Sequence, residues 1–499
     1  MNVQTNVTQA MPAFLSGNVK KQLLIDGKWV ASSSGKTIDS YNPSTGKIIG
    51  TVAAAEARDV DLAVAAARRA LDGPWSKFTP ADRQRVLLKF AELLEREWEQ
   101  LALMDTLDMG VPIAWSRLMQ HMVVPTFRYA AARAVTIHGE TLSNSLPGDI
   151  FSYTVKEPVG VVGGIIPWNG PAFNATWKLA PVLATGCTLV LKCAEQAAFS
   201  PLRMGELCLE AGVPPGVINV ITGYGETAGA ALASHMDVDK ISFTGSSFTG
   251  QRIVQASAVN FKRLTMELGG KSPDIVFADA DLDAAVPGAA MAAFANSGQV
   301  CSAGSRLFVE RKIYDEFTQK VADFGKQLKV GDSMDPETQI GPLVSAEQLK
   351  RVTGYMEAGA KEGAKALSGG ARLTEGPLKD GYFVPPTIFA GVNNDMKIAR
   401  EEIFGPVISA IPFNTMEEAI QIANDTNFGL GSGVWTKDVS KAHTMARKIK
   451  AGSVWVNCYQ AMDPAVPFGG YKMSGYGHEA GLQHVEEYLN TKSVWIKTS

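Results

Sequence analysis

Residues 240–258 read KISFTGSSFTGQRIVQASA, and this stretch indicates how the chain folds. The apolar run Lys240–Phe243 has the length of a buried strand, and the glycine turn Gly245–Gly250 leads into a helical run that extends to Ala258. A helix that starts directly after a strand presents unpaired backbone N–H groups, which suit a pyrophosphate. So short a glycine pattern recurs by chance, so by itself it predicts a strand, a turn and a helix and leaves the ligand open.

Strand-length apolar runs alternate with segments of helical period along most of the chain. This alternation is typical of an α/β fold with a largely parallel sheet. The predicted strands are Gly160–Ile166, Thr188–Leu191, Val217–Ile221, Lys240–Phe243, Arg263–Glu267 and Asp274–Phe277. The predicted helices are Asp61–Leu71, Ala81–Met104, Trp115–Ala134 and Ala172–Ala184.

The composition is that of an ordinary globular enzyme. The 499 residues suffice for two or three domains. Lys and Arg number 47 against 50 Asp and Glu, so the formal net charge is −3 and no basic field exists to gather nucleic acid or anionic lipid. The most apolar run, Val159–Trp168, is far shorter than the ~20 residues that span a bilayer. We therefore expect neither a nucleic-acid nor a membrane partner.

The cysteines and histidines argue against disulfides and metal ions. Five cysteines form no CxxC pair and six histidines show no ligand spacing, so we expect no metal site and a reducing compartment, the cytoplasm. Residues 1–22 lack the apolar segment of a secretory signal, and 1–21 is predicted to be a flexible tail. Four cysteines are expected to be small buried hydrophobes, namely Cys187, Cys193, Cys208 and Cys458.

Polar residues follow four of the predicted strands. In an open parallel sheet, ligands bind in the crevice beyond the carboxyl ends of the strands. Four strand ends that supply an amide, a Lys/Glu pair, a glycine turn and a carboxylate therefore predict one crevice for a nucleotide and a reaction. The residues concerned are Trp168, Asn169, Lys192, Glu195, Gly245, Ser246 and Glu267.

Two residues have the chemistry for the reaction. Cys301 lies among glycine, glutamine and serine, a setting richer in backbone donors than an apolar core, and a thiolate there is able to attack a carbonyl. We expect this thiol to ionise in part near neutral pH. Glu267 ends an apolar strand before two glycines, where partial desolvation would raise its pKa toward that of a general base. From spacing alone, a surface carboxylate at a strand end is an equally good interpretation of Glu267.

A second glycine-rich segment, 222–229, superficially matches the dinucleotide fingerprint. Its final glycine is one residue late, so a plain turn is the better interpretation of the pattern.

Taken together, these residues resemble those of the NAD(P)-dependent aldehyde dehydrogenases, in particular the class that includes the cytosolic and mitochondrial enzymes of animals. The resemblance extends from about Gln22 to the C-terminus, and its motifs occur in the family's order and spacing. The motifs are Ile166–Asn169, Phe243–Ser246, Glu267–Pro273, Gly298–Cys301 and Glu402–Pro406.

The resemblance implies an α/β architecture of three parts. A Rossmann-like NAD-binding domain would comprise 22–134 and 158–270, and an α/β catalytic domain would comprise 271–480. A small β element of 135–157 and 481–499 would pair subunits into a homo-oligomer, more often a tetramer than a dimer.

The resemblance also assigns roles to individual residues. Cys301 matches the nucleophile, Glu267 the general base and Asn169 the side chain that joins the Cys301 backbone N–H in an oxyanion hole. Glu195 matches a carboxylate on the adenosine ribose, which implies NAD in preference to NADP. The implied cofactor residues are Ile166, Pro167, Trp168, Lys192, Glu195, Gly225, Gly245, Ser246, Leu268, Glu402 and Phe404.

The implied substrate pocket departs in part from the family pattern. Gly170 stands where an aromatic residue is frequent, and Asn174 and Gln460 add polarity, which favours an aromatic, hydroxylated or amino-substituted aldehyde. The implied lining is Gly170, Asn174, Trp177, Val300, Ser302, Gln460, Met462 and Phe468. Glu479 matches a second glutamate associated with proton relay, although His478 replaces the arginine usual beside it.

The implied reaction is thiolate attack on an aldehyde, loss of hydride to NAD, and hydrolysis of the resulting thioester, none of which requires a metal. Three alternatives remain. A CoA-acylating dehydrogenase would transfer the acyl group to a thiol, and such enzymes generally lack a base at the Glu267 position. A catalytically silent binding or structural protein and a cofactor-free thiol hydrolase are the other two.

Overall fold

The computed structural model describes residues 13–15 and 20–498; the tail predicted for 1–21 lies mostly outside this range. Its first large sheet has eight strands in the order β20-β12-β11-β8-β9-β10-β2-β3. The five strands from β12 to β10 run parallel, which confirms the prediction. The bounds are β2 Leu23–Ile25, β3 Lys28–Val30, β8 Val161–Ile165, β9 Thr188–Lys192, β10 Ile218–Ile221, β11 Lys240–Thr244, β12 Arg263–Glu267 and β20 Gly475–Tyr476.

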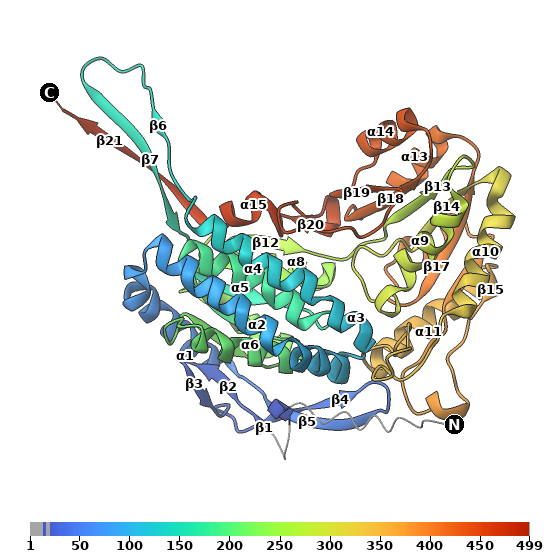
Figure 1. Ribbon diagram of the computed structural model, residues 1–499, viewed down its shortest axis with the longest axis horizontal. Helices are drawn as coiled ribbons and strands as arrows, with labels where there is room; N and C mark the ends of the chain where they lie inside the picture. The colour runs from blue at the N-terminus through green and yellow to red at the C-terminus, as the bar shows by residue number, and fades with distance from the viewer. Residues whose placement is uncertain (1–12, 16–19, 499) are drawn as a thin grey trace.

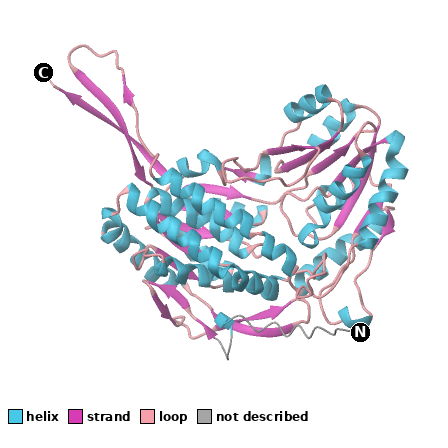
Figure 2. Cartoon of the chain, viewed as in Figure 1, coloured by secondary structure: helices cyan, strands magenta, loops and turns pink. Residues whose placement is uncertain are grey.

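Helices cover both faces of this sheet (Figure 2). The longest, α2 (Pro80–Met109), begins with a reciprocal capping box between Thr79 and Asp82 and ends at Gly110, whose φ of 83° is left-handed. The other helices are α1 Ala57–Asp72, α3 Ile113–Leu118, α4 Gln120–Ala134, α5 Pro171–Thr185, α6 Phe199–Glu210, α7 Ala230–Ser234 and α8 Ser247–Ser257.

One helix prediction was wrong. The segment predicted as a single helix over Trp115–Ala134 is two helices, α3 and α4, that meet at Met119. The Met119 N–H bonds to the carbonyls of Trp115, Ser116 and Arg117, so the last turn of α3 tightens and the chain restarts as α4. An apolar periodicity continues through such a turn and therefore conceals it.

The second large sheet has seven strands in the order β15-β16-β17-β14-β13-β18-β19, parallel except for the β15–β16 pair. Its strands are β13 Pro273–Val276, β14 Arg306–Glu310, β15 Lys365–Ser368, β16 Thr387–Ala390, β17 Val407–Phe413, β18 Gly431–Trp435 and β19 Ser453–Val456. Its helices are α9 Leu282–Phe294, α10 Tyr314–Gln327, α11 Ala346–Lys361, α12 Lys397–Arg400, α13 Met416–Asn424 and α14 Val439–Lys448. Separate apolar clusters fill its two faces.

Two smaller sheets complete the fold. Strands β1 (Lys20–Lys21), β4 (Thr37–Asn42) and β5 (Lys47–Ala53) form one of them. In the other, β21 (Leu489–Lys497) pairs antiparallel with all of β7 (Ile150–Pro158), which also pairs with β6 (Thr141–Leu142). The sheet formed by β6, β7 and β21 projects from the body as an arm (Figure 1). Phe151 and Trp495 on the arm are exposed.

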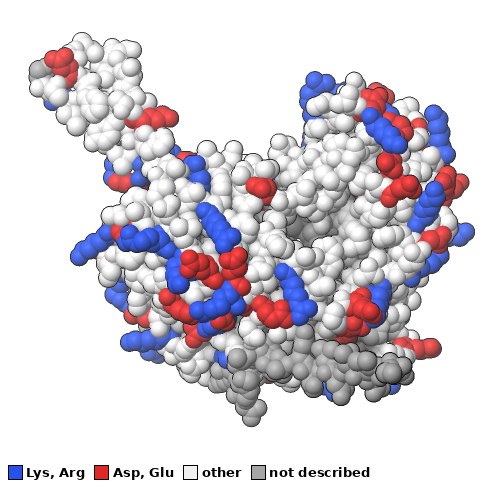
Figure 3. Space-filling view, in the orientation of Figure 1, with Lys and Arg blue, Asp and Glu red and all other residues white. Residues whose placement is uncertain are grey.

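Surface properties agree with the composition. Basic and acidic side chains are interspersed over the face drawn in Figure 3, with no broad patch of one sign. No helix in the described part of the chain is long and apolar enough to cross a membrane. Cys187, Cys193 and Cys208 are buried as predicted, but Cys458 is exposed, because it lies in the loop that leaves β19.

Candidate active site

The sheet order brings the predicted strand ends together. Glu267 at the end of β12 is in register with Thr244 on β11, and Ile165 on β8 is in register with Phe243 on one side and Lys192 on the other. Since these strands are parallel neighbours, the segments after them meet at one edge of the sheet. The segment Ile166–Asn169, Lys192, Ser246 and Glu267 therefore all lie along that edge.

The loop that carries Cys301 has an unusual backbone. Asn296 and Ser297 have φ angles of 50° and 55°, and Gly298 follows with 71°, so three successive residues are left-handed. A Cβ at Gly298 would lie 2.0 Å from the Gly405 carbonyl oxygen, so only glycine fits. Ser297 Oγ donates to the Gly341 carbonyl at 2.8 Å. Packing against distant segments thus holds the loop in a conformation that it would not adopt alone.

Asn169 is attached to this loop. Its Nδ2 donates to the Gln299 carbonyl at 2.9 Å, and Asn296 Nδ2 donates to the Asn169 carbonyl at 3.1 Å. An amide nitrogen carries two N–H groups, so one anchors Asn169 beside Cys301 and the other is left to donate. The sequence did not predict that Asn296 and Gln299 hold Asn169 in place. Its only signal was that both amide residues lie close to Gly298 in the chain.

The pKa of the Cys301 thiol is higher than the sequence led us to expect. Burial raises its pKa to about 12, and the nearby Glu267 and Glu402 carboxylates add to the shift. The expectation of partial ionisation near neutral pH was wrong, because burial disfavours the thiolate and the neighbouring charges are carboxylates. The thiol needs a base to react.

Glu267 is a buried carboxylate without a partner. The residue is 2% exposed, and neither of its oxygens has a hydrogen bond within the described chain. Burial raises its pKa well above the ordinary value, the Glu479 charge raises it further, and Lys178 opposes the shift. The surface interpretation is thereby excluded, and the predicted upward pKa shift is confirmed. An unsatisfied carboxylate here is able to accept a proton from a thiol or from water.

A second set of residues forms a cradle for an anionic or ribose-containing group. Ser246 caps α8 and accepts from the Thr249 N–H at 3.1 Å, which leaves the first N–H groups of the helix pointing outward. Glu195 accepts from the Gly225 N–H at 2.7 Å and lies 3.4 Å from Lys192 Nζ. The second glycine-rich segment, predicted to be a plain turn, forms a π-helical turn over Gly225–Gly229.

The remaining predicted cofactor residues come from the segments after β8 and β12 and from the segment before β17. Glu402 accepts from the Gly270 N–H at 2.9 Å, and burial raises its pKa to about 7. Phe404 has a left-handed φ of 60°, and its ring meets the Trp168 ring edge-on at 5.2 Å. Ile166 and Leu268 are buried while Pro167 is half-buried, so those three position the backbone at the sheet edge.

An aromatic cluster adjoins Cys301. Trp177 packs on Phe468 at 5.6 Å and on Phe173 at 4.5 Å, and Met462 and Cys301 contact the same cluster. The predicted pocket residues Trp177, Met462 and Phe468 are thereby brought together. Phe173, Leu430, Trp455 and Tyr459 belong to the cluster and were not predicted.

The polar residues predicted to line the substrate pocket differ in their hydrogen bonding. Asn174 Nδ2 donates to the Gly170 carbonyl at 2.9 Å, within its own helical turn. Gln460 has a left-handed φ of 55°, and its buried Nε2 has no partner in the described structure. Ser302 is buried and its carbonyl accepts from Tyr459 Oη at 2.9 Å, whereas Val300 is half-buried. Of the two polar side chains expected to contact a substrate, Asn174 has used one of its two N–H groups, whereas both N–H groups of Gln460 are without a partner in the described structure.

Comparison with known proteins identifies the family. A model of the "Aldehyde dehydrogenase family" matches residues 29–494. The chain belongs to the aldehyde dehydrogenase family. It is 49% identical to "Putative aldehyde dehydrogenase DhaS" of Bacillus subtilis over 98% of both chains. It is 47% identical to human "Aldehyde dehydrogenase, mitochondrial" over 95% of this chain and 92% of the relative.

A solved structure agrees over the whole fold. The "NAD+ complex structure of aldehyde dehydrogenase from bacillus cereus" is 45% identical, covers 98% of each chain and superposes with a TM-score of 0.95. The predicted α/β fold and the predicted enzyme class, an oxidoreductase of the aldehyde dehydrogenase type, are both confirmed. No group of three or more metal-ligating side chains occurs among residues 13–15 and 20–498.

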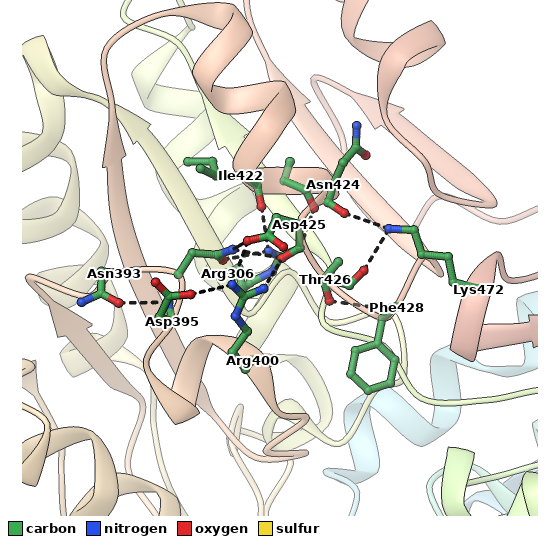
Figure 4. A network of polar contacts seen from close by, with 12 residues as sticks. Arg306, Asn393, Asp395, Arg400, Ile422, Asn424, Asp425, Thr426, Phe428 and Lys472 are labelled. Atoms are coloured by element: carbon green, nitrogen blue, oxygen red, sulfur yellow. Dashed lines mark hydrogen bonds and ion pairs between the residues drawn. The ribbon is translucent and has the colours of Figure 1, made fainter.

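A polar network around Arg306 holds the strand that follows the Cys301 loop. Arg306, five residues after Cys301 at the start of β14, is fully buried. Its guanidinium donates to the carbonyls of Lys271, Ile422 and Ala423 and to Asn394 Oδ1 at 2.8–3.1 Å. Nearby, Arg400 pairs with Asp395 and Asp425 (Figure 4). The network joins strand β14, which follows the Cys301 loop, to the C-terminus of α13.

Proposed function

We propose that the enzyme oxidises an aldehyde to its free carboxylic acid with NAD, through an adduct on Cys301 and a thioester hydrolysed by water that Glu267 activates. The observation that carries this proposal is Glu267, a buried carboxylate without a hydrogen bond, placed close enough to raise the pKa of the Cys301 thiol. A stabilising salt bridge would have satisfied its oxygens; a base must keep them available.

The cradle fits NAD. The α8 N-terminus suits a pyrophosphate, Lys192 and Glu195 suit the adenosine ribose hydroxyls, and Glu402 suits the second ribose. The relative from Bacillus cereus was solved as an NAD+ complex, which supports the same cofactor here. The chemistry that bound NAD supplies is hydride acceptance, which turns the Cys301 adduct into a thioester.

The chain's own residues account for the other steps. Because the pKa of Cys301 is about 12, we infer that Glu267 first takes the thiol proton as sulfur attacks the aldehyde carbon. The second N–H of Asn169 and the Cys301 backbone N–H stabilise the resulting oxyanion, each donor worth about 2.7–4 kcal/mol. Glu267 then releases this first proton to solvent. It next takes a proton from water as the water attacks the thioester, the C–S bond breaks, that proton returns to the departing sulfur to restore the Cys301 thiol, and the carboxylic acid is released.

Glu267→Gln tests this order. The variant should slow steady-state turnover by roughly 10² to 10⁴ because the general base is lost. Rapid mixing of enzyme, NAD and aldehyde then separates the two roles of Glu267. A retained NADH burst with a thioester of the expected mass on Cys301 means that hydrolysis suffers more, and a suppressed burst means that thiol activation does. Normal steady-state turnover in Glu267→Gln would overturn the proposal.

The alternatives have distinct outcomes. Product formation that requires added CoA would establish the acylating enzyme, which we disfavour because Glu267 is present. Absence of NADH formation across a broad aldehyde panel would favour the silent protein or the thiol hydrolase. Neither of these explains the Lys192–Glu195 pair beside the α8 N-terminus.

We propose an aromatic, hydroxylated or amino-substituted aldehyde as the substrate. Trp177, Phe173 and Phe468 provide flat apolar walls next to Cys301. The unpartnered Gln460 amide favours an acceptor atom on the substrate, since a fatty chain would leave that donor unsatisfied. Comparing kcat/KM for aliphatic, aromatic, hydroxylated and amino-aldehydes tests this assignment, and a clear preference for long aliphatic aldehydes would contradict it.

We also propose the organisation that the resemblance implies. In it, 22–134 and 158–270 bind NAD, 271–480 carry the nucleophile, and 135–157 with 481–499 join subunits into a homotetramer. Exposed Phe151, Trp495 and Ile496 on the projecting arm support an interface there. Strand β20 (Gly475–Tyr476) nevertheless pairs with β12, so the C-terminal part of 271–480 contributes to the first sheet. Three buried free cysteines support a reducing compartment, the cytoplasm.

A further inference from the structure

The turn before α11, residues 341–345, makes two buried hydrogen bonds with the Cys301 loop, and we call it the α11 turn. Ser297 Oγ donates to the first carbonyl of the turn at 2.8 Å. The Val344 backbone N–H donates to Gln299 Oε1 at 2.9 Å. Both bonds are shielded from water, so the α11 turn is a fixed support for the loop.

The side-chain amide of Gln299 has a determined orientation. A backbone N–H can only donate, so the atom that faces the Val344 N–H is the amide oxygen, Oε1. The amide nitrogen, Nε2, donates to the Asn296 carbonyl at 3.2 Å, within the loop itself. Gln299 is 1% exposed, so losing either contact would leave a buried polar group unpaired. The Gln299 side chain therefore links the loop to the α11 turn.

Helix α11 also holds the segment that carries Glu402 and Phe404. Gln348 Nε2 donates to the Phe404 carbonyl at 2.7 Å, and Arg351 Nη2 donates to the Glu402 carbonyl at 2.5 Å. Both donors lie in the first two turns of α11, whose N-cap is Ser345 of the α11 turn. Phe404 has a left-handed φ of 60°, a conformation that needs such outside support. The helix and its turn thus hold this segment and the Cys301 loop together.

Apolar packing adds a third contact. Val344 belongs to a small buried apolar cluster, and the Trp168 ring packs against that cluster. Trp168 also meets the Phe404 ring edge-on at 5.2 Å, and Asn169 is the next residue in the chain. The α11 turn therefore contacts all three segments that surround the reaction, and Gln299 is its side-chain link to the nucleophile.

We propose that Gln299 is a positioning residue for hydride transfer: by linking the Cys301 loop to the α11 turn, it sets where the Cys301 adduct lies relative to Glu402 and Phe404. This inference rests on the proposed function. As the oxyanion of the adduct closes to a carbonyl, the C–H bond breaks and hydride passes with its electron pair to NAD, so the adduct is oxidised to the thioester and NAD is reduced. A misplacement of about 1 Å slows such a step by the order of 10².

The other chemical steps depend less on this link. Attack by the thiol and hydrolysis of the thioester use Cys301, Glu267 and Asn169. The Asn169 side chain donates to the Gln299 backbone carbonyl, which a side-chain replacement does not remove. The loop also keeps its Ser297 hydrogen bond. Loss of the Gln299 side chain should therefore slow hydride transfer more than it slows attack or hydrolysis.

Ester hydrolysis without NAD separates this role from general damage. A thiol nucleophile with an oxyanion hole and a base hydrolyses an activated ester such as p-nitrophenyl acetate, and that reaction has no hydride step. Gln299→Met has a similar length and no amide. It should lower kcat for aldehyde oxidation about tenfold or more but ester hydrolysis by about twofold or less. Hydride transfer then becomes the slow step, so an aldehyde deuterated at C1 should give a full primary isotope effect on kcat.

Two measurements without substrate show whether the variant is intact. The affinity for NAD by titration and the rate at which iodoacetamide alkylates Cys301 without NAD should both stay close to the wild-type values. Gln319→Met is the matched control, because Gln319 is exposed on α10 and the replacement is the same. This control should have wild-type rates in every assay.

A second variant covers the case in which Gln299→Met does not fold. Ser297→Ala removes the other hydrogen bond to the α11 turn and should show the same pattern. Equal losses of ester hydrolysis and aldehyde oxidation, unchanged aldehyde oxidation in both variants, or the absence of an isotope effect would overturn the inference. The proposed function is judged separately, because normal turnover in Cys301→Ala would overturn it whatever Gln299→Met shows.

Discussion

Arg306 and Glu267 are both buried charges near Cys301, and their surroundings are opposite. Every nitrogen of the Arg306 guanidinium donates to a carbonyl or amide oxygen, whereas neither oxygen of Glu267 has a partner in the described chain. Burial and the neighbouring Arg400 lower the pKa of Arg306 to about 9, and burial raises that of Glu267. Arg306 therefore stays charged at neutral pH and holds the structure, while Glu267 keeps both oxygens available for proton transfer.

The largest loss of turnover should come from replacing Cys301, the proposed nucleophile. Cys301→Ala should reduce turnover on the order of 10⁴-fold or more, because no covalent adduct is possible. Titration with NAD should give nearly unchanged affinity, since the thiol is not part of the cradle. Cys458→Ala is the matched control, because Cys458 is exposed and should have normal turnover. A tenth of wild-type turnover in Cys301→Ala would refute the assignment.

Breaking the satisfied network should cost stability. Arg306→Met leaves four acceptors without this donor, two of them in fully buried hydrogen bonds, so the free energy of unfolding should fall by about 3–5 kcal/mol. Arg400→Met is the control within the same network (Figure 4), because its side chain is 34% exposed and such a pair is worth about 1 kcal/mol or less. Urea titrations at one protein concentration measure both, and equal losses would contradict the comparison.

Urea titration of Glu267→Gln should show a gain in the free energy of unfolding, not a loss. The folded-state pKa of Glu267 is raised, so the wild type loses stability as pH rises from the ordinary value of 4.5 to that raised pKa, whereas the variant does not titrate there. The variant should therefore become the more stable by roughly 1–3 kcal/mol as pH rises through that window. The difference should vanish toward low pH, where wild-type Glu267 is protonated. A pH-independent difference would show that Glu267 does not titrate in this range.

The smallest effect should be in the cradle, away from both regions. The wild type should prefer NAD over NADP by about tenfold or more in kcat/KM, because Glu195 would meet a 2′-phosphate as a like charge. Glu195→Gln should weaken the use of NAD and narrow that gap, while Lys192 and the Gly225 N–H remain in place. Equal kcat/KM for the two cofactors in the wild type would contradict the proposed repulsion between Glu195 and the 2′-phosphate.

The strand ends were predictable from the sequence because each is a local pattern. An apolar run followed by glycine or a polar residue shows where a strand stops, and Asn169, Lys192, Ser246 and Glu267 all lie at such points. Local pattern failed at Met119, where a tightened turn keeps the helical periodicity, and at Cys458, whose exposure depends on how its loop packs. It also failed for the pKa of Cys301, which depends on burial and, after that, on carboxylates from two other segments.

The sequence by itself determined the α/β fold and the strand ends, because short-range backbone preferences and apolar periodicity are visible residue by residue. Only the tertiary structure decided which polar groups are satisfied. Lys178 and Glu479, which form a buried ion pair, are 301 residues apart in the chain, and Asn169 and Gln299 are 130 apart. Whether a buried carboxylate has a partner depends on such distant contacts, and that separates Arg306, which stabilises the fold, from Glu267, which remains available to react.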